Sequence, residues 1–183
     1  IYMGDWSSDV CSSDLAQKQV FESTFFRLLD TVRQLVQNSQ FAPGNHGINA
    51  MHTWALTLRD SEGQALRRKD LRPAEARKLF ELWFSRYRHQ LEHYFELVSV
   101  TLELIERSDR PDKIFYVDIL RANLSPGEQF LLFHYGSAGA EQGKPRFKES
   151  AERYGLFEVF EPETYDLPSE RRLWYSARKI KRP

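Results

Sequence analysis

The sequence predicts an all-α single domain of about six helices, one of them long and central. Three observations carry this prediction. Apolar residues recur at spacings of three and four through most of the chain, which is the period of an amphipathic helix. Proline and glycine stand mostly between these segments. No run of alternating apolar and polar residues is long enough to build a sheet.

The first fifteen residues are expected to lie outside this domain. The stretch DWSSDVCSSDL, residues 5–15, has neither a helical nor a strand period. A secretory signal would need a basic start, and no Lys or Arg precedes Lys18. The stretch resembles the one-frame translation of a sequencing adapter, so we expect a non-native leader joined to a truncated gene. The expected division is leader 1–15, helical domain 16–160 and basic tail 161–183.

Charge and cysteine content limit the chemistry. The whole chain has 26 basic and 26 acidic residues. Without the leader there are 26 basic and 23 acidic residues and no cysteine, because Cys11 is the only one. This excludes disulfides, thiolate metal sites and a cysteine nucleophile from the domain. No metal cluster, phosphate loop, nucleophile triad or carboxylate pair stands out, so we expect no metal and no cofactor.

The first two helices are expected at residues 17–39 and 47–60. The first has an apolar face of Phe21, Phe25, Leu28, Val32, Leu35 and Val36. The segment FAPGNHG, residues 41–47, separates the two helices. In the second helix the residues expected to face inward are Ile48, Met51, Ala55 and Leu58, and SEGQ, residues 61–64, is expected to form a turn.

The longest helix is expected from Pro73 to about Arg107, because proline suits a first helical turn. Its core stripe is Phe80, Phe84, Tyr87, Leu91, Tyr94, Val98 and Ile105. The opposite side is a solvent face of Ser85, Arg88, Glu92, Glu96, Ser99 and Glu103. Between them runs a stripe that is apolar at both ends and polar in the middle: Leu79, Trp83, Arg86, Gln90, His93, Leu97, Val100 and Leu104.

The polar middle of that stripe is the first candidate site. Arg86, Gln90 and His93 stand at positions i, i+4 and i+7 of one helix. This spacing projects all three side chains to one side over about two turns. They are the candidate catalytic residues.

The remaining helices have clear boundary signals. Residues 108–112 form a turn, and a helix follows at 113–124. In LSPGE, Ser125 is placed to cap a helix, Pro126 takes its first position and Glu128 completes a capping box. That helix is expected to end at the glycines of residues 136–145. A last helix is expected at 147–157, closed by Gly155.

Four stretches carry a family resemblance: FESTFFRLL (21–29), LEHYFELVSVTLELIE (91–106), ILRANLSPGEQFLLFHY (119–135) and RFKESAERYGLF (146–157). In this order they resemble the putative phage abortive infection protein family, the AbiC-like bacterial defence proteins. The motif residues are His93, Tyr94, Phe95, Arg121, Leu124, Ser125, Glu128 and Phe133. The sequence departs from the family pattern at Glu96, Asn123 and the pair His134 and Tyr135.

The resemblance implies a bacterial anti-phage function in which an infected host is harmed to stop phage propagation. It implies membrane-spanning helices just before the FESTFF stretch, residues 21–26, so the native protein would be anchored in the inner membrane with this domain in the cytoplasm. The helix at 17–39 would then continue a membrane helix as a rigid lever. A phage-derived trigger, a host target protein or a second copy of the chain are the partners considered. An interaction or effector role is preferred over an enzyme.

His93 has two interpretations. The favoured one is a hydrogen-bonded core histidine in a mostly apolar stripe. The alternative is a ribonuclease toxin of the helical HEPN type, in which an Arg precedes a His on a long helix with four to six residues between them. Arg88 and Arg86 both satisfy that spacing, and Arg86 shares the stripe of His93. Arg86 would then hold a phosphate of RNA while His93 assists proton transfer, in a site built by two copies.

Two further features have competing interpretations. Arg121 is expected to satisfy carbonyls at the end of its own helix or to pair with Asp118, and a switch or partner surface at this corner is the alternative. The tail combines Trp174 and Tyr175 with six cations, which suits nucleic acid or an anionic membrane. A solvated tail is favoured. The six cations are Arg171, Arg172, Arg178, Lys179, Lys181 and Arg182.

Overall fold

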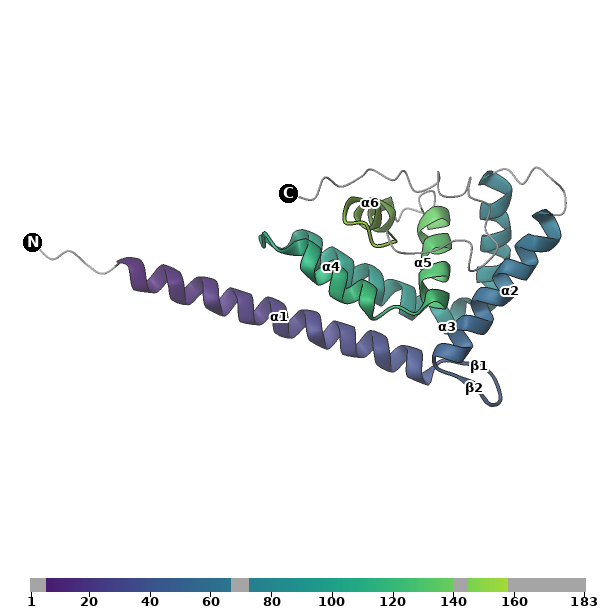
Figure 1. Ribbon diagram of the computed structural model, residues 1–183, viewed down its shortest axis with the longest axis horizontal. Helices are drawn as coiled ribbons and strands as arrows, with labels where there is room; N and C mark the ends of the chain where they lie inside the picture. Colours follow the sequence, from purple (N-terminus) through teal and green to yellow (C-terminus); the bar gives the residue numbers. More distant parts are fainter. Residues whose placement is uncertain (1–5, 67–72, 140–144, 158–183) are drawn as a thin grey trace, which may run out of the picture.

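The computed structural model describes residues 6–66, 73–139 and 145–157 and confirms an all-α single domain (Figure 1). The described part contains six helices and one short hairpin. Its elements are α1 (Trp6–Asn38), β1 (Gln40–Ala42), β2 (Asn45–His46), α2 (Ile48–Leu66), α3 (Pro73–Arg107), α4 (Lys113–Ala122), α5 (Pro126–Gly139) and α6 (Pro145–Arg153). The basic tail lies outside the described residues.

Helix α5 forms the centre of the domain. Residues 130–136 are all buried, because the sequence FLLFHYG offers no polar stripe to solvent apart from a histidine and a tyrosine. Helices α2, α3 and α6 pack against α5, and Figure 1 shows it upright among them. At its first turn α5 closely approaches α2: a Cβ on Gly127 would lie 3.0 Å from the Cα of His52. Glycine therefore permits this contact.

Helix α1 is joined to α4 by aromatic and charged contacts. The Tyr116 ring meets Phe21 and Phe25 edge-on, at centroid distances of 4.8 and 5.2 Å. Its hydroxyl donates a hydrogen bond to Glu22 at 2.9 Å. Burial and this hydrogen bond raise the pKa of Tyr116.

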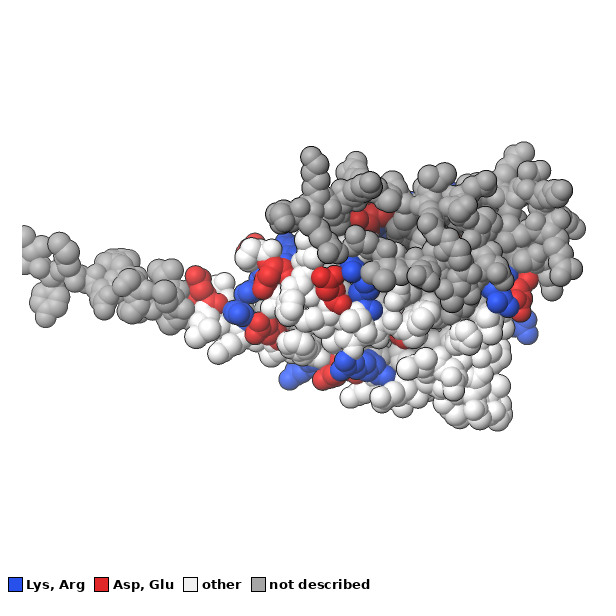
Figure 2. All heavy atoms as spheres, viewed as in Figure 1, with Lys and Arg blue, Asp and Glu red and all other residues white. Residues whose placement is uncertain are grey.

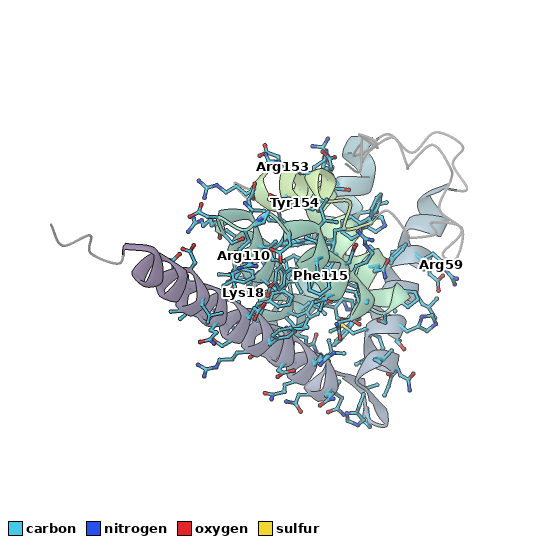
Figure 3. The ribbon with its side chains drawn as sticks, turned by 60° about the vertical axis from the view of Figure 1, so that its left-hand side comes forward. Lys18, Arg59, Arg110, Phe115, Arg153 and Tyr154 are labelled. Atoms are coloured by element: carbon cyan, nitrogen blue, oxygen red, sulfur yellow. The ribbon has the colours of Figure 1, made fainter. Side chains whose placement is uncertain are left out.

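Charged groups surround the same junction. Figure 3 shows Lys18 of α1 near Arg110, which precedes α4. Arg110 donates to Asp112 at 3.0 Å, and this hydrogen bond lowers the pKa of the Asp112 carboxyl. Among the described residues on the face drawn in Figure 2, basic and acidic side chains are interspersed.

Helix α3 bends around α5. Residues 84 and 95 are eleven positions apart, which is about 16 Å along a straight helix. The rings of Phe84 and Phe95 nevertheless lie only 5.6 Å apart between centroids. The Tyr135 ring of α5 contacts both, at 4.5 Å from Phe95 and 6.3 Å from Phe84. The concave side of α3 therefore faces α5, and its convex side faces away from the core.

Several predicted boundaries are wrong. α1 begins at Trp6, so residues expected to lie outside the fold are helical from that point. α2 runs through SEGQ to Leu66, and α5 continues through Gly136 to Gly139. In these places the neighbouring helical turns outweigh the local preference of serine and glycine. α3 begins and ends as predicted.

Two other expectations fail in helix α2 and in the loop before it. FAPGNHG forms the hairpin of β1 and β2, with Gly44 at a φ of 79° in its turn. Ile48 was expected to face the core, but its side chain is 62% exposed at the first position of α2. Met51, Ala55 and Leu58 are fully buried as predicted, and Trp54 joins them.

Candidate functional site

The convex side of α3 presents an exposed polar face, which we define as Arg86, His89, Gln90 and His93. The structure places the three predicted candidates Arg86, Gln90 and His93 on this helix, and all three side chains are exposed. The favoured interpretation of His93 as a buried core histidine is therefore wrong. The bend explains the difference, because it turns the middle of the stripe away from the core while Trp83 remains buried.

His89 belongs to this face, although the sequence interpretation missed it. It stands four residues before His93, so the helical period itself was the signal that would have found it. The earlier assignment followed the mostly apolar stripe of Leu79, Trp83 and Leu97, and His89 lies just beside that line. The polar face is thus broader than predicted.

The two arginines of the ribonuclease hypothesis are both exposed. The Arg86 guanidinium lies over the ring of Tyr87, with its Cζ atom 5.7 Å from the ring centroid. Arg88 lies in the same way over Phe84 at 5.5 Å. Exposure therefore does not decide which arginine is the better partner of His93. Position on the helix does, because only Arg86 stands seven residues from His93, two turns along the same side.

A cleft of about 450 Å³ adjoins the polar face between α2 and α3. Its floor is aromatic, and the Trp83 indole N–H donates to the Thr57 hydroxyl at 3.1 Å. Arg86 lines both the cleft and the polar face, so the two form one continuous surface. The lining residues are Thr57, Asp60, Ser61, Leu79, Leu82, Trp83, Arg86 and Tyr87.

A second candidate region is the buried corner where α5 begins, defined by Tyr94, Ser125 and Glu128. The predicted capping box is present. The backbone N–H and the hydroxyl of Ser125 donate to one Glu128 carboxylate oxygen at 3.0 and 2.6 Å, and the Glu128 N–H points back to the Ser125 hydroxyl at 3.4 Å. The Tyr94 hydroxyl donates to the other carboxylate oxygen at 2.9 Å.

Two of the three side chains of this corner are almost completely closed to water, and Ser125 is half-buried. Glu128 is 2% exposed and Tyr94 is 1% exposed. Burial raises the pKa of Tyr94 well above its ordinary value, and the neighbouring Glu128 carboxylate raises it further. The phenol is therefore held neutral as a hydrogen-bond donor.

Arg121 connects this corner to the end of α6. It pairs with Asp118 at 3.0 Å, as predicted. The carbonyls that it satisfies are not those of its own helix, however: it donates to the carbonyls of Gly155 at 2.7 Å and Leu156 at 3.3 Å. Sequence reasoning could not find these two carbonyls, because they lie more than thirty residues from Arg121 and helical periodicity relates only residues of one helix.

Those carbonyls belong to a Schellman motif that ends α6. Gly155 has a φ of 64°, and the N–H groups of Gly155 and Leu156 donate to Glu152 and Ala151 at 3.3 and 2.9 Å. The predicted closure by Gly155 is thus present. Leu156 is fully buried beneath it.

The family-motif residues differ in their exposure. His93 is exposed and Arg121 and Ser125 are half-buried, whereas the others are buried: Tyr94, Phe95, Leu124, Glu128 and Phe133. Asn123, where the sequence departs from the family pattern, accepts a hydrogen bond from Arg33 of α1 at 2.9 Å. Of the other departures, His134 and Tyr135 are buried in α5 and Glu96 is exposed.

Two classes of feature are not found in the described part of the chain. There, no group of three or more His, Cys, Asp or Glu side chains is placed to hold a metal ion. Among the same residues, none of the helices has the length and apolar character needed to span a bilayer.

The fold and these two regions define a helical domain with one polar network inside it and one polar face outside. The model of the family described as "Putative phage abortive infection protein" matches residues 86–164. This match confirms the predicted resemblance from Arg86 of α3 to residue 164. The stretch 21–29, which also carries the predicted resemblance, lies outside the match. It supports a role in phage abortive infection. No curated protein and no solved structure matches the chain.

Proposed function

We propose that this domain is an anti-phage effector that acts by abortive infection through contact with a partner protein. The observation that carries the proposal is that the family match begins at Arg86 and includes the whole polar face of α3. The buried corner supports the fold, whereas the polar face is accessible to another molecule. A phage-derived trigger or a host target protein is the proposed partner.

The shape of the surface favours recognition of a protein. The cleft between α2 and α3 combines Leu82, which is 69% exposed, with the aromatic rings of Trp83 and Tyr87. Arg86 stands at the junction of the cleft and the polar face. Arginine and aromatic side chains next to an apolar recess are the groups that dominate protein interfaces.

The alternative function is a HEPN-like ribonuclease. The observation that favours it is the exposure of Arg86 and His93 on one side of α3, two turns apart. In this alternative Arg86 binds a phosphate of RNA and His93 assists proton transfer as the ribose 2′-hydroxyl attacks. Two copies of the chain would pair their α3 helices to build the site.

Membrane anchoring of the native protein is part of the proposal. It rests on the family resemblance, which implies membrane-spanning helices just before the FESTFF stretch, residues 21–26, and a cytoplasmic position for this domain. Helix α1 suits a connecting role, because Val20 and Phe26 on its outer side are 67% and 46% exposed. Fractionation of cells that express the intact gene would contradict this part if the protein remained in the supernatant.

The test is phage plating and host survival with the intact gene, comparing Arg86→Ala and His93→Ala with Arg88→Ala as the matched control. Both polar-face variants are expected to express normally and lose protection, whereas the control keeps it. Protection that survives both variants would exclude the polar face. RNA from infected cells then separates the two functions: cleavage that disappears in His93→Ala supports the ribonuclease, and intact RNA supports the effector.

A further inference from the structure

Two exposed histidines stand one helical turn apart on the convex side of α3. His89 and His93 are at positions i and i+4, a spacing that brings their Cβ atoms to within about 5–6 Å. Both side chains lean the same way along the helix, so their ring nitrogens can converge on one point. We propose that His89 and His93 chelate a divalent transition-metal ion of the zinc class. This inference does not rest on the proposed function.

Neither ring is engaged by the rest of the described chain. Neither imidazole makes a hydrogen bond or an ion pair with the described residues. Arg86 and Arg88 precede them on α3, and their guanidinium groups lie over the rings of Tyr87 and Phe84. Glu92, directly before His93, contributes a carboxylate of the sign that a bound cation favours. The pair is therefore accessible to an ion from solvent.

The chemistry of the donors selects the class of ion. Neutral imidazole nitrogen is a preferred ligand of Zn²⁺, Ni²⁺ and Cu²⁺, whereas Mg²⁺ and Ca²⁺ require oxygen ligands. Two histidines at i and i+4 are also the helical arrangement by which zinc-dependent hydrolases hold their metal. In this chain His89 and His93 have that spacing, and Gln90 stands between them on the same face.

His89 and His93 supply two of the four ligands that a closed tetrahedral zinc site has. Because the described residues contain no third ligand placed with them, a tetrahedral ion keeps two positions for water or for donors of a partner. Arg86, a group that binds anions, stands three residues before His89 on the same face. An affinity in the micromolar range is expected, weaker than that of a structural zinc site with four protein ligands.

The experiment is isothermal titration of the full chain, purified without a histidine tag, with ZnCl₂ at pH 7.5. His89→Ala and His93→Ala are each expected to weaken binding by at least about tenfold, as the loss of a metal ligand requires. Both side chains are exposed, so the urea midpoint of each variant should stay at the wild-type value.

Two controls make the result decisive. His46→Ala removes an exposed histidine from β2, and Cys11→Ser removes the single thiol. Both are expected to bind zinc as the wild type does. Undiminished binding in both α3 variants, absence of binding in the wild type, or loss of binding in either control would overturn the inference. Phage plating of His89→Ala is a separate readout, because the ribonuclease alternative does not use His89.

Discussion

The corner of Tyr94, Ser125 and Glu128 and the polar face of α3 meet at two adjacent residues, Tyr94 and His93. The two regions differ in exposure, because Tyr94 is buried and His93 is exposed. In the corner both Glu128 carboxylate oxygens accept hydrogen bonds and the side chain is almost fully buried. On the polar face the imidazole of His93 makes no such bond within the described chain. A family motif can therefore combine a structural residue and an accessible one side by side.

The largest expected effect comes from Glu128→Ala, which breaks the corner. It would leave the Tyr94 hydroxyl buried without its acceptor and remove the carboxylate that accepts from Ser125 in the capping box of α5. We expect a loss of about 3 kcal/mol in the free energy of unfolding, measured by urea denaturation. Glu128→Gln is the matched control and should lose less, because its amide oxygen still accepts from Tyr94. A midpoint equal to that of the wild type would show that the corner is not structural.

A smaller effect is expected from Arg121→Ala, which removes the hydrogen bonds between α4 and the Schellman motif after α6. The variant loses charge-assisted hydrogen bonds to the Gly155 and Leu156 carbonyls, so unfolding should become easier by about 2 kcal/mol. Thermal unfolding measures this change. Arg33→Ala, which removes a more exposed contact with Asn123, should cost less. Equal losses in both variants would contradict the special role of Arg121.

Tyr94→Phe tests the raised pKa of the corner. At neutral pH the lost hydrogen bond should lower stability by about 1 kcal/mol. Above pH 10 an unfolded tyrosine ionises while folded Tyr94 keeps its proton, so its contribution to stability decreases as pH rises further. The stability difference between wild type and Tyr94→Phe should therefore shrink above pH 10. Urea titrations between pH 8 and 11 measure it, and a difference independent of pH would contradict the assignment.

The smallest effect belongs to the polar face. Arg86→Ala combined with Gln90→Ala should change the free energy of unfolding by less than about 0.5 kcal/mol, because both side chains are exposed. The same urea measurement serves for this variant. A loss comparable to that of Glu128→Ala would show that the face is part of the folding core, and the contrast between the two regions would disappear.

Local signals predicted the elements whose evidence lies within a few residues. The capping box at Ser125, the proline at the start of α3 and the glycine after α6 each act over one helical turn, and the structure has all three. An interruption of α3 was left open by the sequence, but the place and direction of its bend were not predicted, because the contacts of Tyr135 with two rings eleven residues apart lie between different helices. His93 was assigned to the core for the same reason: its exposure follows from that bend and not from its neighbours in sequence.

The bend of α3 has a consequence for the surface on its convex side. A proline would fix a kink in the covalent chain, whereas here Tyr135 packs against both Phe84 and Phe95 on the concave side of the bend. A substitution at position 135, deep in the core, therefore changes the spread of the side chains on the outer surface without altering any of them. The spacing of the side chains on the polar face is therefore adjustable from inside the core.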